Sequence, residues 1–161
     1  MGAFMETSTS PVEIVVRMLV AMVIGAAVGW ERESRGRNAG LRTHIMVALG
    51  AAGFTLIAME FFGWLDRRGF QSGPSLGDPL RIIAAIVGGV GFLGAGAIIE
   101  NRGRVKGLTT AASIWVVAAT GMAAGAGFYI IAATMTVLAL TTLVLVHFLE
   151  RLYVNANNKR R

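Results

Sequence analysis

Five long apolar runs constrain this chain more than any other feature, because each is long enough to cross a lipid bilayer as a helix. A transmembrane helix needs about 17–25 mostly apolar residues, and short charged or glycine-rich segments separate these runs. Only 15% of the residues are charged, whereas a soluble domain typically has about 25%. The sequence therefore predicts an all-α fold, a polytopic membrane bundle of about five transmembrane helices. The expected spans are residues 12–29, 43–64, 80–99, 108–126 and 128–149.

Almost the whole chain belongs to this bundle. We expect an outer N-terminal segment at 1–11, a transmembrane helical domain at 12–149 and a basic cytoplasmic tail at 150–161. The first span is expected to be retained, because the segment before it has no Lys or Arg of the kind that begins a signal peptide. Only residues 125–127 separate the last two spans. One continuous helix there would exceed the bilayer thickness, so we predict a turn.

The basic residues predict the orientation, since cytoplasmic loops carry an excess of Lys and Arg. With five spans, eleven basic residues fall on one side and three on the other. The larger group consists of Arg32, Arg35, Arg37, Arg42, Arg102, Arg104, Lys106, Arg151, Lys159, Arg160 and Arg161. The N-terminus is therefore expected outside and the C-terminus in the cytoplasm. The net charge of +6 is assigned to contact with membrane lipid and not to nucleic acid, because the chain has no basic-aromatic nucleic-acid module.

Glycines in the first, third and fourth spans predict close helix contacts, because small residues let backbones approach each other in a bilayer. Gly89, Gly91 and Gly94 match a dinucleotide-binding string, but they lie inside an apolar helix and not between a strand and a helix. The expected packing residues are Gly25, Gly29, Gly88, Gly91, Gly94, Gly96, Gly121 and Gly125. We expect a homo-oligomer packed through these faces, with a dimer favoured. A break in the third helix that marks a binding site is the alternative.

Two features are expected on the outer side. Asp78 and Pro79 predict the start of the third helix, with Asp78 as its N-cap and Arg81 in its first turn. Glu13 and Arg17 lie four residues apart and are expected to form an ion pair near the membrane interface.

A charged cytoplasmic face carries the candidate functional residues. The second and fourth helices are both expected to begin there, capped by Thr43 and by Thr109 or Thr110. Two helix N-termini beside basic side chains predict an anion site, whereas ion pairing with the glutamates predicts a structural clamp. The clamp is favoured and the anion site is kept as its alternative. The candidate residues are Glu31, Arg32, Glu33, Arg42, His44, Lys106, Thr109 and Thr110.

The sequence contains no pattern of catalytic residues. It has no cysteine, which excludes thiolate metal ligands and a cysteine nucleophile. It also has no Ser-His-Asp set, no phosphate-binding Walker loop and no cluster of metal-ligand residue types. We therefore expect no catalytic residue, no bound metal and no cofactor.

Several segments together resemble the MgtC/SapB family of bacterial inner-membrane proteins. They occur in the family's order and lie within about residues 11–129. The segments are Gly29-Trp30-Glu31-Arg32-Glu33, Ala39-Gly40-Leu41-Arg42-Thr43-His44, Asp78-Pro79-Leu80-Arg81-Ile82, Gly91-Phe92-Leu93-Gly94-Ala95-Gly96-Ala97-Ile98-Ile99, Gly107-Leu108-Thr109-Thr110-Ala111-Ala112 and Trp115. The resemblance implies a multi-span domain in the bacterial inner membrane.

In the best-known branch, the resemblance further implies a role in growth under low magnesium and in virulence, with the proton ATP synthase as a target. Members are not established magnesium transporters. That branch carries a soluble C-terminal domain where this chain is expected to have only a short tail after Glu150, and it tends to have Asn and Cys where Thr109 and Val116 stand here. Inhibition of ATP synthase is therefore not transferred.

The expected function is that of a non-enzymatic inner-membrane protein. It would modulate membrane physiology or a membrane-protein partner, with a link to magnesium limitation. The alternative is a transporter or channel for an ion or a small anion.

Overall fold

Five helices make up nearly all of the structure, a computed structural model that describes residues 7–69, 79–101 and 104–158. The helices are α1 (Pro11–Ser34), α2 (Leu41–Arg67), α3 (Pro79–Gly96), α4 (Leu108–Gly125) and α5 (Tyr129–Asn158). In the described part of the chain, α1, α2, α4 and residues 129–146 of α5 are long and apolar enough to cross a membrane, and α3 contributes a shorter apolar helix at 81–96. The predicted all-α membrane bundle is confirmed.

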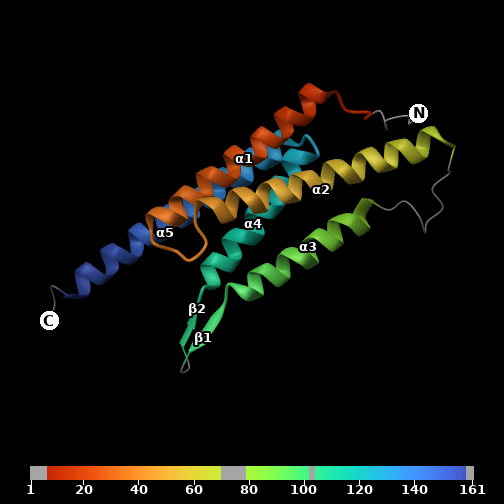
Figure 1. Ribbon diagram of the computed structural model, residues 1–161. Coiled ribbons are helices and arrows are strands. Elements are labelled where there is room, and N and C mark those ends of the chain that lie inside the picture. Colours follow the sequence, from red (N-terminus) through yellow and green to blue (C-terminus); the bar gives the residue numbers. More distant parts are fainter. Residues whose placement is uncertain (1–6, 70–78, 102–103, 159–161) are drawn as a thin grey trace.

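The helix α4 lies at the centre of the bundle and contacts each of the other four helices. Figure 1 shows α3 set apart from the other helices and nearest to α4 beside the hairpin of β1 (Ile99–Asn101) and β2 (Arg104–Lys106). The main core consists mostly of small side chains, as expected where helices are held by close packing within lipid. Its buried members are Ala21, Ile24, Val28, Ala48, Ala52, Val117, Ala124 and Ala132.

Two pairs of glycines lie where this centre is tightest. A Cβ added at Gly25 would lie 2.7 Å from the carbonyl oxygen of His44, and one at Gly29 would lie 2.8 Å from the Cα of Leu41. The same addition at Gly121 or Gly125 would approach a carbonyl oxygen of α2 to 2.5 Å. The backbones of α1 and α4 therefore touch the backbone of α2 directly, at distances that no larger residue permits.

The glycines of α3 have a different environment. A Cβ at Gly88, Gly91 or Gly96 would meet no atom within 4 Å, and at Gly94 it would make an ordinary contact at 3.7 Å with Ala111. The expected packing seam centred on the third span is therefore wrong for contacts within this chain. A contact of these glycines with a second copy stays a prediction.

The helix α3 is continuous through its glycines, so the alternative of a break inside the glycine cluster is wrong for the described backbone. It ends at Gly96, three residues before the predicted end at 99. A hairpin follows, formed by β1 (Ile99–Asn101) and β2 (Arg104–Lys106), with Ile99 opposite Lys106. Apolarity alone did not distinguish Ile98 and Ile99 from a further helical turn, because isoleucine suits both structures.

The predicted turn before the last helix is confirmed. Gly127 has φ 81°, a left-handed conformation that glycine adopts without strain. Arg17 binds this turn: its Nη1 donates to the carbonyl oxygen of Gly125 at 2.9 Å, and its Nε donates to Glu13 at 3.2 Å. The expected ion pair is thus present, and the same arginine also holds α1 against the C-terminal end of α4.

Asp78 lies outside the described residues, so its role as a cap stays a prediction. At the same end of the bundle as Arg81, the carboxylate of Glu60 accepts hydrogen bonds from the amides of Ser8, at 2.5 Å, and Thr9, at 2.9 Å. These contacts fix the segment that precedes α1 against α2.

Candidate functional site

The candidate residues of the predicted cytoplasmic face gather at one end of the bundle. We call this region, residues 30–44, 97–101 and 104–113, the hairpin end, because the β1–β2 hairpin projects from it (Figure 1). Here α1 and α3 end and α2 and α4 begin. The structure divides the candidate residues into three groups with different surroundings.

The first group is a buried ion cluster at the end of α1. Arg32 is only 3% exposed, and its Nε donates to Glu31 Oε2 at 2.5 Å. The Nε of Arg35, one turn later, lies 3.2 Å from the other carboxylate oxygen of Glu31. A buried charge is tolerated when it is paired, and removing one partner is strongly destabilising. Glu31 and Arg32 therefore form the structural clamp that was favoured from the sequence.

The second group closes the start of α2. The amide of Leu41 donates to Glu33 Oε2 at 2.7 Å, so a carboxylate from the end of α1 takes the place of an N-cap side chain. The N-cap residue is Gly40, where a Cβ would lie 2.7 Å from the same carboxylate oxygen. The prediction that Thr43 caps this helix is wrong, because Thr43 already lies in its first turn.

His44 ties α2 to α4. It is completely buried; its Nδ1 donates to the carbonyl oxygen of Gly40 at 2.8 Å, and its Nε2 lies 3.0 Å from the Oγ of Ser113. Ser113 in turn donates to the carbonyl oxygen of Thr110. Sequence reasoning missed Ser113, because its partner is 69 residues away and no local pattern marks the pair.

The third group surrounds the start of α4. Its N-cap is Gly107, with φ 91° and no side-chain hydrogen bond, so the predicted caps Thr109 and Thr110 are wrong. Both threonines, with Lys106, line a cavity of about 570 Å³. The described residues that line it are Gly36, Arg37, Asn38, Val105, Lys106, Gly107, Leu108, Thr109 and Thr110. Arg42 is exposed at the same end but does not line it.

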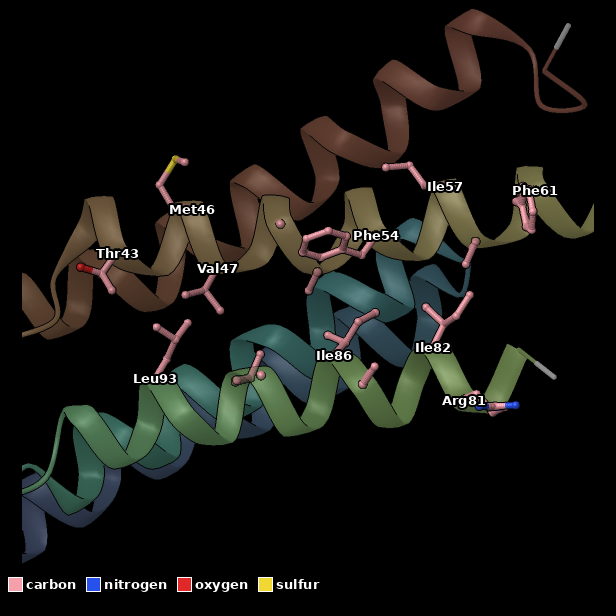
Figure 2. A pocket seen from close by; sticks show the side chains of 16 residues that line it. Thr43, Met46, Val47, Phe54, Ile57, Phe61, Arg81, Ile82, Ile86 and Leu93 are labelled. Carbon is pink, nitrogen blue, oxygen red and sulfur yellow. The ribbon is translucent and has the colours of Figure 1, made fainter. Parts of the chain in front are cut away.

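A larger apolar groove of about 720 Å³ runs between α2 and α3. Figure 2 shows Val47 and Leu93 facing each other near one end and Phe61, Ile82 and Arg81 near the other. Apolar side chains and glycines provide most of its lining, which offers almost none of the oxygen ligands that Mg²⁺ requires. Within the described ranges no group of three or more His, Asp or Glu residues could hold a metal ion.

The family model of the MgtC family matches residues 18–152 of the chain. Three curated relatives have similar sequences. "Putative magnesium transporter YhiD" of Escherichia coli K12 is 40% identical over 148 residues, which are 90% of this chain and 66% of YhiD. "Protein MgtC" of Salmonella typhimurium LT2 is 37% identical over 151 residues, 91% of this chain and 60% of that protein. "Protein SrpB" of Synechococcus elongatus is 38% identical over 135 residues, 79% of this chain and 71% of SrpB.

The chain thus spans less than two thirds of the length of YhiD and of MgtC. No solved structure matches it.

Proposed function

The chain belongs to the MgtC family, and from this premise we propose that it modulates membrane physiology or a membrane partner, without catalysis and in connection with magnesium limitation. It is a multi-pass membrane protein. We further propose that it resides in the bacterial inner membrane with the hairpin end in the cytoplasm. The distribution of basic residues supports this orientation.

The observation that carries the proposal is the direct backbone contact at the centre of the bundle. At Gly121 and Gly125, α4 approaches α2 so closely that a methyl group has no room. A carrier or channel needs a path with polar ligands between both faces of the membrane. Here the buried Glu31, Arg32 and His44 are all at one end of the bundle. Arg32 pairs with Glu31, and His44 contacts Ser113, so these side chains do not form such a path. This arrangement favours a regulatory role over transport.

The test joins a growth assay with a flux assay. A strain without the protein should grow poorly at low magnesium and should recover with the wild-type chain. The purified chain in liposomes should give no flux of magnesium, protons or phosphate above that of empty vesicles. Recovery of growth together with magnesium flux would replace the proposal with transport, and normal growth of the deletion strain would remove the link to magnesium.

Transport is the second candidate, because a relative 40% identical over 90% of this chain carries the name of a magnesium transporter. A magnesium path through this chain would have to use carbonyl or hydroxyl oxygens, since the α2–α3 groove is almost wholly apolar. The flux assay above decides between the two candidates.

We also propose that the chain forms a homodimer through α3. Ala84, Gly88, Gly91 and Ala95 are exposed and recur at the spacing that places them on one helix face. Small residues at such spacing let two membrane helices approach closely. Gly88→Leu should abolish crosslinking between copies in lipid, and unchanged crosslinking would contradict this interface.

A further inference from the structure

We propose that the cavity at the start of α4 binds a phosphate-bearing anion. The cavity lies between the α1–α2 loop and the first turn of α4, and its volume of about 570 Å³ falls in the ordinary range of ligand sites. The proposal goes beyond the function proposed above and does not depend on it. Three features of the lining support it: two cations, a helix N-terminus without a side-chain cap, and a threonine hydroxyl without a partner among the described residues. The arrangement at the start of α2 is a fourth argument.

The cations come from two separate segments. Arg37 lies in the loop between α1 and α2, and Lys106 is the last residue of β2. None of the described residues that line the cavity is Asp or Glu; Glu100, in β1, lies opposite Val105 and is not part of this lining. The cavity therefore presents two positive side chains to a ligand without a compensating acid. Arginine and lysine are the residues that bind phosphate oxygens most strongly.

The N-terminus of α4 opens into the same cavity. Leu108, Thr109 and Thr110 form the first helical turn, and the amides of a first turn have no acceptor within their own helix. The N-cap Gly107 has no side chain to accept from them. An added Cβ at Gly107 would overlap the carbonyl group of Ala97, so only glycine fits beside the end of α3. The packing against α3 therefore requires glycine at position 107, and glycine has no side chain that could cap α4.

The hydroxyl of Thr110 is a second and independent indication of a ligand. Thr110 is only 4% exposed and lines the cavity. Its hydroxyl has no hydrogen-bond partner in the part of the chain that the structure describes. The other buried hydroxyls behave differently, because each donates to a backbone carbonyl three or four residues earlier. These are Thr55, Ser113, Thr120 and Thr136. Because Thr110 lines the cavity, its hydroxyl can donate to water or to a bound acceptor there.

The chain itself shows how a helix N-terminus at this end is neutralised. At the start of α2, a carboxylate oxygen of Glu33 accepts the amide of Leu41 at 2.7 Å. The start of α4 has no side-chain cap, and none of the described residues that line the cavity is a carboxylate. An external anion would take the position that Glu33 occupies at α2. A phosphate group suits this position, since its several oxygens can accept from amides, Thr110 and both cations together.

Two sources could deliver this group. A free phosphate or a phosphomonoester would enter from the aqueous phase, and a phospholipid headgroup would enter from the membrane surface. Leu108 lines the cavity and is 59% exposed, so one edge of the site is apolar. The shared chemistry is a phosphate group held at a helix N-terminus by Arg37, Lys106 and Thr110.

The experiment measures saturable binding to the purified full chain. One arm titrates inorganic phosphate into the protein in neutral detergent and follows phosphorus NMR and the melting temperature. The other arm compares nanodiscs of phosphatidylcholine alone with nanodiscs that also contain phosphatidic acid. Saturation in the first arm identifies a soluble anion, and saturation only with phosphatidic acid identifies a headgroup. Absence of saturation in both arms overturns the proposal.

Three variants locate the site. Lys106→Gln should weaken binding about tenfold, the loss of one charge-assisted contact. Thr110→Val should also weaken binding but should leave the melting temperature of the ligand-free protein unchanged or higher, because the hydroxyl that it removes has no partner among the described residues. Arg42→Gln is the matched control, since it removes the same charge at the same end outside the cavity. Equal weakening in Arg42→Gln, or wild-type binding by both Lys106→Gln and Thr110→Val, contradicts the proposed site.

Discussion

Replacing Gly121 by alanine should destabilise the bundle, because the new methyl group has no room between α4 and α2. It would lie 2.5 Å from the carbonyl oxygen of Ala48 and 3.0 Å from its Cα. These are backbone atoms, which cannot rotate away as a side chain can. To reach ordinary contact at 3.4 Å, α4 must move by 3.4 − 2.5 = 0.9 Å. A gap of that size forfeits about a quarter to a half of each dispersion contact that it separates, and overpacking costs about 1–3 kcal/mol.

The matched control is the same substitution at Gly88. No atom lies within 4 Å of a Cβ there, so alanine adds no collision. Alanine is favoured over glycine in a helix interior by about 0.5–1 kcal/mol. Gly88→Ala should therefore stabilise the monomer slightly, while Gly121→Ala destabilises it. The gain in helix propensity is common to both substitutions, so the two variants should differ by the overpacking cost, about 1–3 kcal/mol in the free energy of unfolding.

The measurement is equilibrium unfolding in mixed micelles, followed by circular dichroism while the fraction of denaturing detergent increases. Protein should be dilute enough to remain monomeric, so that a contact between copies does not affect Gly88. The reasoning is refuted if Gly121→Ala unfolds at the wild-type midpoint, or if both variants shift in the same direction by the same amount.

Three further substitutions test individual contacts by the same unfolding measurement. Arg17→Gln should cost about 1.5–3 kcal/mol, because it removes the charged hydrogen bond to the carbonyl of Gly125; an unchanged midpoint would show that the contact is not stabilising. Glu33→Ala should cost about 1 kcal/mol, the usual effect of losing a helix cap, since Leu41 then loses its acceptor; equal stability would disprove the capping role. His44→Leu should cost about 1–3 kcal/mol, because buried polar partners are left unpaired; a more stable variant would contradict this.

The number and approximate position of the helices could be predicted from the sequence, because the cost of exposing polar backbone to lipid forces each apolar run into a helix. The ends of the helices were less accurate. The first span was predicted to end at Gly29, whereas α1 continues to Ser34. Hydropathy marks the end of the apolar run, and the helix continues beyond it because Glu31 pairs with Arg32 and Arg35 there.

The caps could not be predicted, because the residues that satisfy the first amides are not the local ones. Thr43 and Thr109 fit the usual preference for hydroxyl side chains at an N-cap. The actual N-caps are Gly40 and Gly107, and the acceptor at α2 is Glu33, seven residues before the N-cap. Capping across a loop depends on the path of that loop, and the periodicity of apolar residues in the helices does not predict this path.

The glycine motifs show a similar limit. Gly121 and Gly125 touch α2, whereas Gly88 and Gly91 touch nothing in the chain, although both pairs lie in apolar helices with similar composition. A small residue permits a close approach but does not choose the partner. The partner depends on which helices the loops bring together, and α4 is the central helix here.

The charged residues of the hairpin end therefore fall into two sets that the sequence presents as one. Glu31, Arg32 and Glu33 are occupied within the fold, since they pair with one another or cap α2. Arg37 and Lys106 line a cavity in which none of the described lining residues is an acid. Removing a member of the first set leaves a buried charge or an uncapped helix, so stability should fall first and activity only as a consequence. Removing a member of the second set breaks no contact that closes the bundle. Loss of function without loss of stability should therefore map to the start of α4 and not to the buried ion cluster.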